Sequence, residues 1–145
     1  MSKLIYLDNA ATTKTAPEVL EAMLPYFTEQ YGNPSAIYSF ASHNKDVVAE
    51  QRERIANALG AKSNEIYFTA GSESDNWALK ATAEAYQNKG KHIITTKIEH
   101  HAILHTAAYL EERGFEVTYL DVDEYGKVNP ADVEAAIRPD TILIS

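Results

Sequence analysis

The segment Gly71–Asn76 is the first place in this sequence where residue types and spacing suggest chemistry. It stands between an expected strand and an expected helix. Amides in the first turn of a helix have no partner within it, and the helix dipole makes that end positive. Gly71 lets a phosphate approach the backbone closely, and the Ser72 hydroxyl could donate to a phosphate oxygen. Alternatively, Ser72 caps the helix by accepting from a first-turn amide. Anion binding and capping both remain open.

The segment Glu99–His101 follows an expected strand, His92–Thr96. If the strands run parallel, this segment lies near Gly71–Asn76 at the carboxyl edge of the sheet, where α/β proteins place their functional loops. An imidazole at that edge could stack on a planar ring or move protons near neutral pH. The two segments are therefore candidates for one shared site.

The spacing of His101 and His105 allows a second interpretation. The two residues are four apart on one face of an expected helix, and such a pair can hold a metal together with Glu99 or His100. Histidines near a helix start are also commonly plain surface or capping residues. Catalysis, metal binding and a surface role remain three alternatives.

Strands and helices alternate along the chain. Strands are expected at Lys3–Leu7, Glu65–Thr69, His92–Thr96, Glu116–Leu120 and Thr141–Ile144. Helices are expected from about Pro17, from about Ser42 to Leu59, from Glu73 to about Asn88, from about His101 to Arg113 and from Pro130 to Ile137. Asp8–Thr13 is expected to form a turn and Tyr31–Ser35 a loop. The alternation predicts an α/β fold with a mostly parallel sheet and helices on both faces.

Composition narrows the possible partners. The 145 residues include 21 acidic and 13 basic side chains, a formal net charge of −8, so nucleic acid is not expected as a partner. The absence of cysteine excludes disulfides, thiolate metal sites and a cysteine nucleophile within this chain. No apolar stretch approaches the roughly 18 residues of a membrane span, and no signal peptide precedes Asp8. We therefore expect no membrane association and a cytoplasmic location.

Four motifs in order resemble the aminotransferase class V family, and specifically its cysteine desulfurase branch, which supplies sulfur for iron–sulfur cluster assembly. The motifs are Tyr6–Thr13, Gly32–Ser35, Phe68–Asn76 and Glu99–Leu104. The resemblance implies the fold of the large domain of pyridoxal-phosphate (PLP) dependent transferases. It assigns residues 1–16 to a segment of the small domain and residues 17–145 to the N-terminal part of the PLP-binding large domain.

The resemblance also implies a cofactor site and a reaction. Gly71, Ser72 and Glu73 correspond to the turn that holds the PLP phosphate, and His100 to the residue that stacks on the pyridine ring and assists proton transfer. The substrate would be L-cysteine, and the products L-alanine and an enzyme persulfide. Family members form homodimers and pass sulfur to acceptor or scaffold proteins.

Two features set this chain apart from a complete family member. The family's cofactor-binding Lys and Asp, its substrate Arg and its catalytic Cys belong to motifs that follow this stretch, so the chain alone is predicted to be inactive. The phosphate turn is one residue shorter than usual, and Ala36, Tyr38 and Ala41 replace the usual Ser, His and Gly. A selenocysteine lyase, another class V enzyme, a non-catalytic subunit of a split enzyme and a small metal-binding protein remain alternatives.

Overall fold

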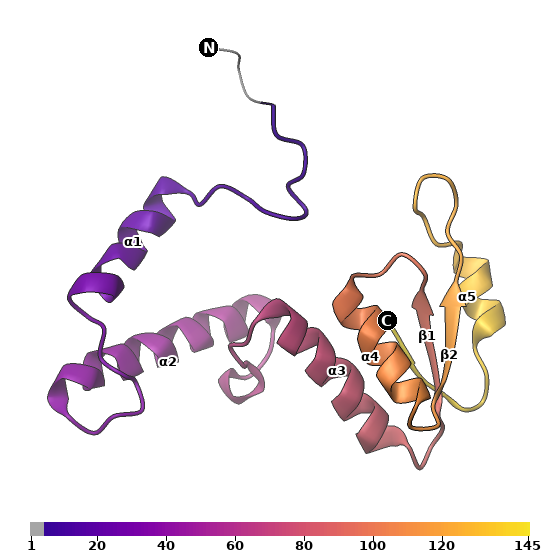
Figure 1. Cartoon of the computed structure of the whole chain (residues 1–145). Helices are drawn as coiled ribbons and strands as arrows, with labels where there is room; N and C mark the ends of the chain where they lie inside the picture. The colour runs from indigo at the N-terminus through magenta and orange to yellow at the C-terminus, as the bar shows by residue number, and fades with distance from the viewer. Residues whose placement is uncertain (1–4) are drawn as a thin grey trace. The chain divides into compact units, whose positions relative to one another are not determined.

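The computed structural model describes residues 5–145, which form two compact units that divide between Tyr67 and Phe68 (Figure 1). Within residues 5–145, none of the helices combines the length and the apolar character that crossing a bilayer requires. The expected division of domains at residue 16 concerns a complete family member, and it stays a prediction.

The first unit contains helices and connecting turns. Its elements are α1 (Pro17–Thr28), α2 (Ser39–Leu59) and a short 3-10 helix, η1 (Ser63–Glu65). Pro17 occupies the first turn of α1, where its missing N–H costs nothing, and Gly60 ends α2 with a φ of 69°. The loop before α2 is held by Asn44, whose side-chain amide donates to the carbonyls of Gln30 and Gly32 at 2.5 and 2.6 Å.

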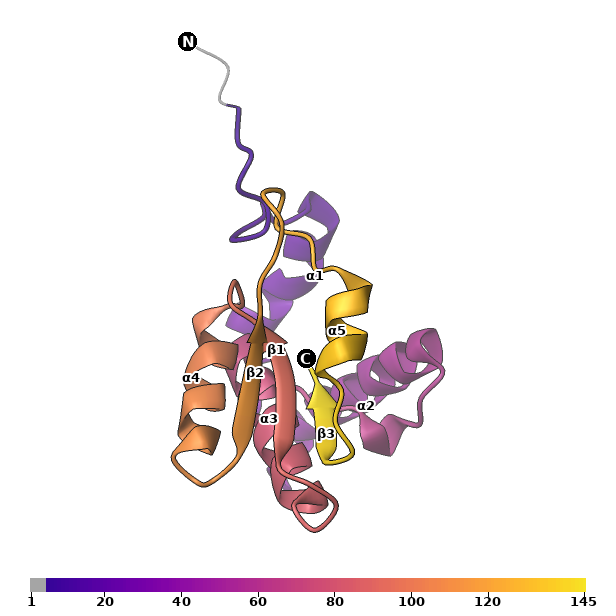
Figure 2. The same cartoon turned by 90° about the vertical axis from the view of Figure 1, so that its right-hand side faces the viewer.

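The second unit is a parallel α/β layer structure. Its elements are α3 (Gly71–Tyr86), β1 (His92–Thr96), α4 (His101–Glu111), β2 (Glu116–Leu120), α5 (Pro130–Ala136) and β3 (Thr141–Ile144). The three strands are parallel in the order β2-β1-β3, with β1 in the middle (Figure 2). Helices α3 and α4 lie on one side of the sheet and α5 on the other (Figures 1 and 2). The predicted α/β class is confirmed.

The core of this unit is centred on Ile93 of β1, which is fully buried. Val117 of β2 and Leu143 of β3 flank it in register, so one row of apolar side chains crosses the sheet. Residues of α3 and α4 complete the cluster: Leu79, Ala83, Ile103 and Leu110. The sheet thereby fixes the two helices that begin with the candidate site segments.

Two expected strands are not found. Residues 66–70, which cover most of the strand expected at Glu65–Thr69, have no regular secondary structure, and Glu65 itself closes η1. Part of Lys3–Leu7 lies outside the described residues, and residues 5–7 are not a strand. A strand exists only when its backbone groups pair with a neighbour, and within residues 5–145 neither segment pairs with β1, β2 or β3. Pairing of this kind cannot be read from the apolar pattern of one segment.

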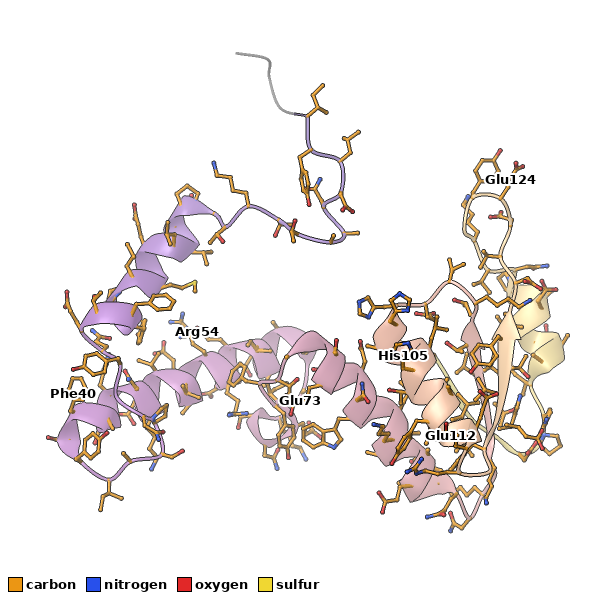
Figure 3. All side chains as sticks on the ribbon, viewed as in Figure 1. Phe40, Arg54, Glu73, His105, Glu112 and Glu124 are labelled. Atoms are coloured by element: carbon orange, nitrogen blue, oxygen red, sulfur yellow. The ribbon has the colours of Figure 1, made fainter. Side chains whose placement is uncertain are left out.

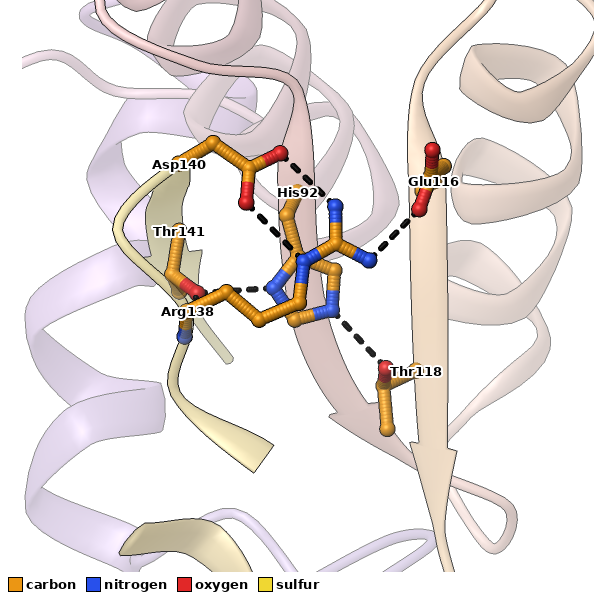
Figure 4. Close-up of polar contacts among 6 residues, drawn as sticks. All are labelled: His92, Glu116, Thr118, Arg138, Asp140 and Thr141. Atoms are coloured by element: carbon orange, nitrogen blue, oxygen red, sulfur yellow. Dashed lines mark hydrogen bonds and ion pairs between the residues drawn. The ribbon is translucent and has the colours of Figure 1, made fainter. Parts of the chain in front are cut away.

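The amino-terminal ends of the strands are joined by a polar cluster around His92 (Figure 4). The buried imidazole bonds through Nδ1 to the hydroxyl of Thr141 at 2.7 Å and through Nε2 to that of Thr118 at 2.8 Å. Arg138 donates twice to the Asp140 carboxylate, at 2.9 and 2.7 Å, and once to Glu116. The cluster joins all three strands of the sheet.

The buried His92 makes the stability of the second unit depend on pH. Burial, and after it the charge of Arg138, lower the pKa of His92, against the opposing influence of Asp140 and Glu116. The unfolded chain therefore binds a proton near pH 6.5 that the folded chain resists, and the free energy of unfolding falls as the pH drops below that value. The slope is at most about 1.4 kcal/mol per pH unit. We expect urea unfolding followed on β1 amide signals to show this loss between pH 7.5 and 5.5.

Substitution of single histidines tests whether His92 causes this pH dependence. His92→Gln should flatten the profile over this range, while His43→Gln, at an exposed histidine bonded to Gln30 at 2.9 Å, should leave its shape unchanged. The Asp140 carboxyl, whose pKa Arg138 holds below its ordinary value, stays ionised throughout. An unchanged slope in His92→Gln would assign the effect to another group.

Candidate functional site

Helix α3 begins at Gly71, two residues before the expected start, so the candidate phosphate residues form its first turn. The residue before the helix is Ala70, and no side chain caps this end. The first intrahelical bond runs from the Ser74 amide to the Ala70 carbonyl at 2.9 Å, so the amides of Gly71, Ser72 and Glu73 precede it. The capping interpretation of Ser72 is wrong, because Ser72 is the second helical residue.

Local hydrogen bonds explain why the helix starts here. The hydroxyl of Ser74 donates to the Ala70 carbonyl at 3.3 Å and contacts the hydroxyl of Thr69. Glu73 places a negative charge in the first turn, where it stabilises the positive end of the helix (Figure 3). These interactions stabilise the first turn without using the backbone amides of Gly71, Ser72 and Glu73.

His100 is the residue that caps α4. Its Nδ1 accepts a hydrogen bond from the Ala102 amide at 3.0 Å, which places the ring proton of the neutral imidazole on Nε2. Glu99 turns back toward β1, where it accepts from the Thr96 hydroxyl at 3.1 Å. The exposed His100 ring therefore keeps one N–H available to a ligand.

The structure brings Ser72 and His100 together. Both line one open cavity of about 450 Å³ between the starts of α3 and α4. Gly71 and Glu73 do not line it with their own atoms, although they flank Ser72 in the helix. The two segments were expected to meet because the strands before them, Glu65–Thr69 and His92–Thr96, would be parallel. Of these two strands only the second forms, as β1, and the packing of α3 on α4 brings the segments together instead.

On α3, Asn76 and Lys80 also line this cavity; Asn76 belongs to the candidate segment but was given no role there, and Lys80 was not singled out from the sequence. They follow Ser72 at intervals of four, so they lie on the same face of α3, and this spacing could have indicated them. Asn76 donates to the Ser72 carbonyl at 2.9 Å. The Lys80 ammonium lies 4.3 Å from the ring centroid of Tyr109. Both residues line the cavity from the side of α3.

The metal alternative of the sequence analysis involved four residues, and they are not gathered around one point. Over residues 5–145, no group of three or more His, Asp or Glu side chains is placed to hold a metal ion. His101 and His105 do stack, with ring centroids 5.5 Å apart. Figure 3 shows His105 on α4.

The sequence model of aminotransferase class V proteins matches residues 5–145. The chain belongs to the aminotransferase class V family. It is 60% identical to the cysteine desulfurase IscS of Clostridium botulinum (strain Kyoto / Type A2) over 100% of its own length, which is 37% of that protein. The chain thus spans well under half the length of this relative.

Solved structures of similar proteins agree with this chain in fold. A NifS-like protein superposes with a TM-score of 0.84 at 39% identity, covering 94% of this chain and 38% of the other. A structure described as SspA in complex with cysteine gives a TM-score of 0.81 at 43% identity, covering 93% and 39%. The alignment with the Clostridium protein runs over 146 positions against 145 residues here, so it leaves at least one position without a residue of this chain.

Proposed function

We propose that this chain is the N-terminal part of a PLP-dependent cysteine desulfurase, which works as a cytoplasmic homodimer and supplies sulfur to acceptor or scaffold proteins for iron–sulfur cluster assembly. Membership of the class V family and the 60% sequence identity to a cysteine desulfurase support the reaction type. The SspA structure in complex with cysteine supports L-cysteine as the substrate. The residues proposed for the cofactor site are Gly71, Ser72, Glu73 and His100.

The geometry that carries the proposal is the uncapped start of α3 beside the His100 ring. A phosphate monoester attached to a pyridine ring needs several donors for the phosphate and a planar surface for the ring. Three leading amides and the Ser72 hydroxyl offer the donors, and His100 on the same cavity offers the plane. A Cβ placed on Gly71 meets nothing within 4 Å, so the backbone at this position is open to a ligand. The residues fit the cofactor.

Each residue has a separate task in this proposal. Gly71 and Glu73 donate backbone N–H groups to the phosphate, while the Glu73 carboxylate balances the helix dipole. Ser72 adds its hydroxyl. His100 covers one face of the ring and, with its proton on Nε2, exchanges protons with the bound amino acid.

The complete reaction breaks the Cβ–S bond of cysteine. PLP, when bound, supplies the electron sink that makes this cleavage accessible. The sulfur passes to an enzyme thiolate as a persulfide, and the remaining three-carbon unit gains a proton to become alanine. The chain has no cysteine, so the thiolate belongs to residues outside it.

Binding of pyridoxine 5′-phosphate tests the proposal. This compound carries the ring and the phosphate but no aldehyde that would react with surface lysines. We expect it to shift the amide NMR signals of Gly71, Ser72 and Glu73, and Ser72→Ala to weaken binding roughly tenfold, since a hydrogen bond to a charged group is lost.

Two controls accompany the titration. Pyridoxine without phosphate should leave these signals in place, and Ser74→Ala, whose hydroxyl is used within the helix start, should bind within about twofold of the original chain. Equal binding of pyridoxine, or an equal loss in Ser74→Ala, would contradict the phosphate assignment. Release of sulfide from L-cysteine by the purified chain with PLP would contradict the assignment of the thiolate to residues outside it.

A further inference from the structure

The first two turns of α4 carry a pair of histidines that the proposed cofactor site does not use. His101 and His105 are exposed, lie one turn apart and stack with ring centroids 5.5 Å apart and an interplanar angle of 29°. The other three of the five histidines are all hydrogen-bonded: His43 to Gln30, His92 to two threonines and His100 to the Ala102 amide. Over residues 5–145, the nitrogens of the stacked pair make no hydrogen bond.

The centroid spacing of the pair suits a shared metal ion. With metal–nitrogen bonds of about 2.1 Å, two imidazoles bound to one ion have centroids about 4.5 to 5.5 Å apart. The observed spacing lies at the upper end of this range. The rings are close to parallel, so their nitrogens converge only after rotation of the side chains, which exposed residues make freely.

We propose that His101 and His105 form a two-histidine site for a divalent transition metal, with Cu²⁺ bound most tightly. Neutral imidazole suits Cu²⁺, Ni²⁺ and Zn²⁺, and Cu²⁺ leads the affinity order of the divalent ions. Helix α4 holds the two residues at a fixed spacing, so binding of the second imidazole is intramolecular and strengthens the complex. Water completes the coordination, since only two protein ligands are present, and the ion exchanges readily.

The surroundings neither block nor complete the site. Lys80 lines the same cavity, but its ammonium lies over Tyr109, 4.3 Å from the ring centroid, one helical turn beyond His105. His100 is 6.2 Å from His101 between centroids, and its Nδ1 is already occupied by the Ala102 amide. The proposed site therefore involves neither Ser72 nor His100 and does not depend on the proposed function.

Titration of the full chain with Cu²⁺ alone, in a buffer that does not bind metals, tests the proposal. We expect one ion per chain by calorimetry and an electron paramagnetic resonance spectrum with coupling to two imidazole nitrogens. His101→Ala and His105→Ala should each weaken binding roughly tenfold or more and leave coupling to one nitrogen.

His43→Ala is the matched control, since it removes an exposed histidine from another helix, and it should leave the affinity within about twofold. All three substitutions are at surface positions, so circular dichroism should show unchanged folding. Full affinity in His105→Ala, or a loss in His43→Ala as large as in the α4 variants, would overturn the proposal. A spectrum with coupling to a single nitrogen in the original chain would do the same.

Discussion

Gly90→Ala is expected to separate β3 from β1 and to destabilise the second unit by about 3 kcal/mol or more. Gly90 lies in the turn that leads from α3 into β1. A Cβ added there would lie 2.1 Å from the Asp140 carbonyl oxygen and 2.7 Å from its Cα, and backbone atoms cannot rotate away as a side chain does. The same carbonyl accepts the His92 amide at 3.1 Å, the bond that begins the pairing of the two strands. Relief of the clash therefore costs that bond.

Gly71→Ala is the matched control for this substitution. A Cβ at Gly71 meets nothing within 4 Å, its backbone is helical, and alanine is at least as good a helix former as glycine. We expect urea unfolding to show no loss of stability for Gly71→Ala and a large loss for Gly90→Ala, with the β3 amides exchanging fastest. Equal stability of the two variants would show that the turn at Gly90 adjusts without moving Asp140.

The strands of the second unit could be predicted from sequence because their signal is local. β1, β2 and β3 are β-branched and apolar segments bounded by turn residues, and the structure has all three at the predicted residues. The segment Glu65–Thr69 has a similar pattern but forms no strand, because a strand also requires a partner. Helix starts were predicted less closely: α3 begins two residues before the expected start, where hydrogen bonds of Ser74 fix its first turn.

The candidate site was predictable in its chemistry but not in its full extent. The neighbourhood of Ser72 and His100 was predicted, but from a strand at Glu65–Thr69 that does not form; the packing of α3 on α4 brings the two residues together. The spacing of Asn76 and Lys80 from Ser72 indicates that they share one face of α3, but whether that face borders the cavity depends on how α3 packs against α4. The environment of His92 could not be predicted from the sequence either, because its hydrogen-bond partners, Thr118 and Thr141, belong to two other strands.

Ile93→Ala is expected to cost about 2 to 5 kcal/mol of unfolding free energy. Ile93 is fully buried at the centre of the apolar row and contacts the core residues of α3 and α4, so the truncation leaves a cavity that rigid neighbours cannot fill. Ile98→Ala removes the same atoms from a side chain that is 59% exposed, and it should change stability by only about 0.5 kcal/mol. Urea unfolding of both variants measures the difference.

The loss at Ile93 should reach the cavity as well. Ser72 and His100 stand at the starts of α3 and α4, and these helices are held to the sheet by Leu79, Ile103 and the side chain that is removed. We expect amide exchange to accelerate along both helices in Ile93→Ala while the amides of α2 exchange as before, since local opening follows local packing. Protection of α3 and α4 equal to that of the original chain would mean that the cavity is held by the loops themselves. If exchange does accelerate, a ligand that bridges Ser72 and His100 would recover part of the lost stability, because it binds only when the starts of the two helices are packed together.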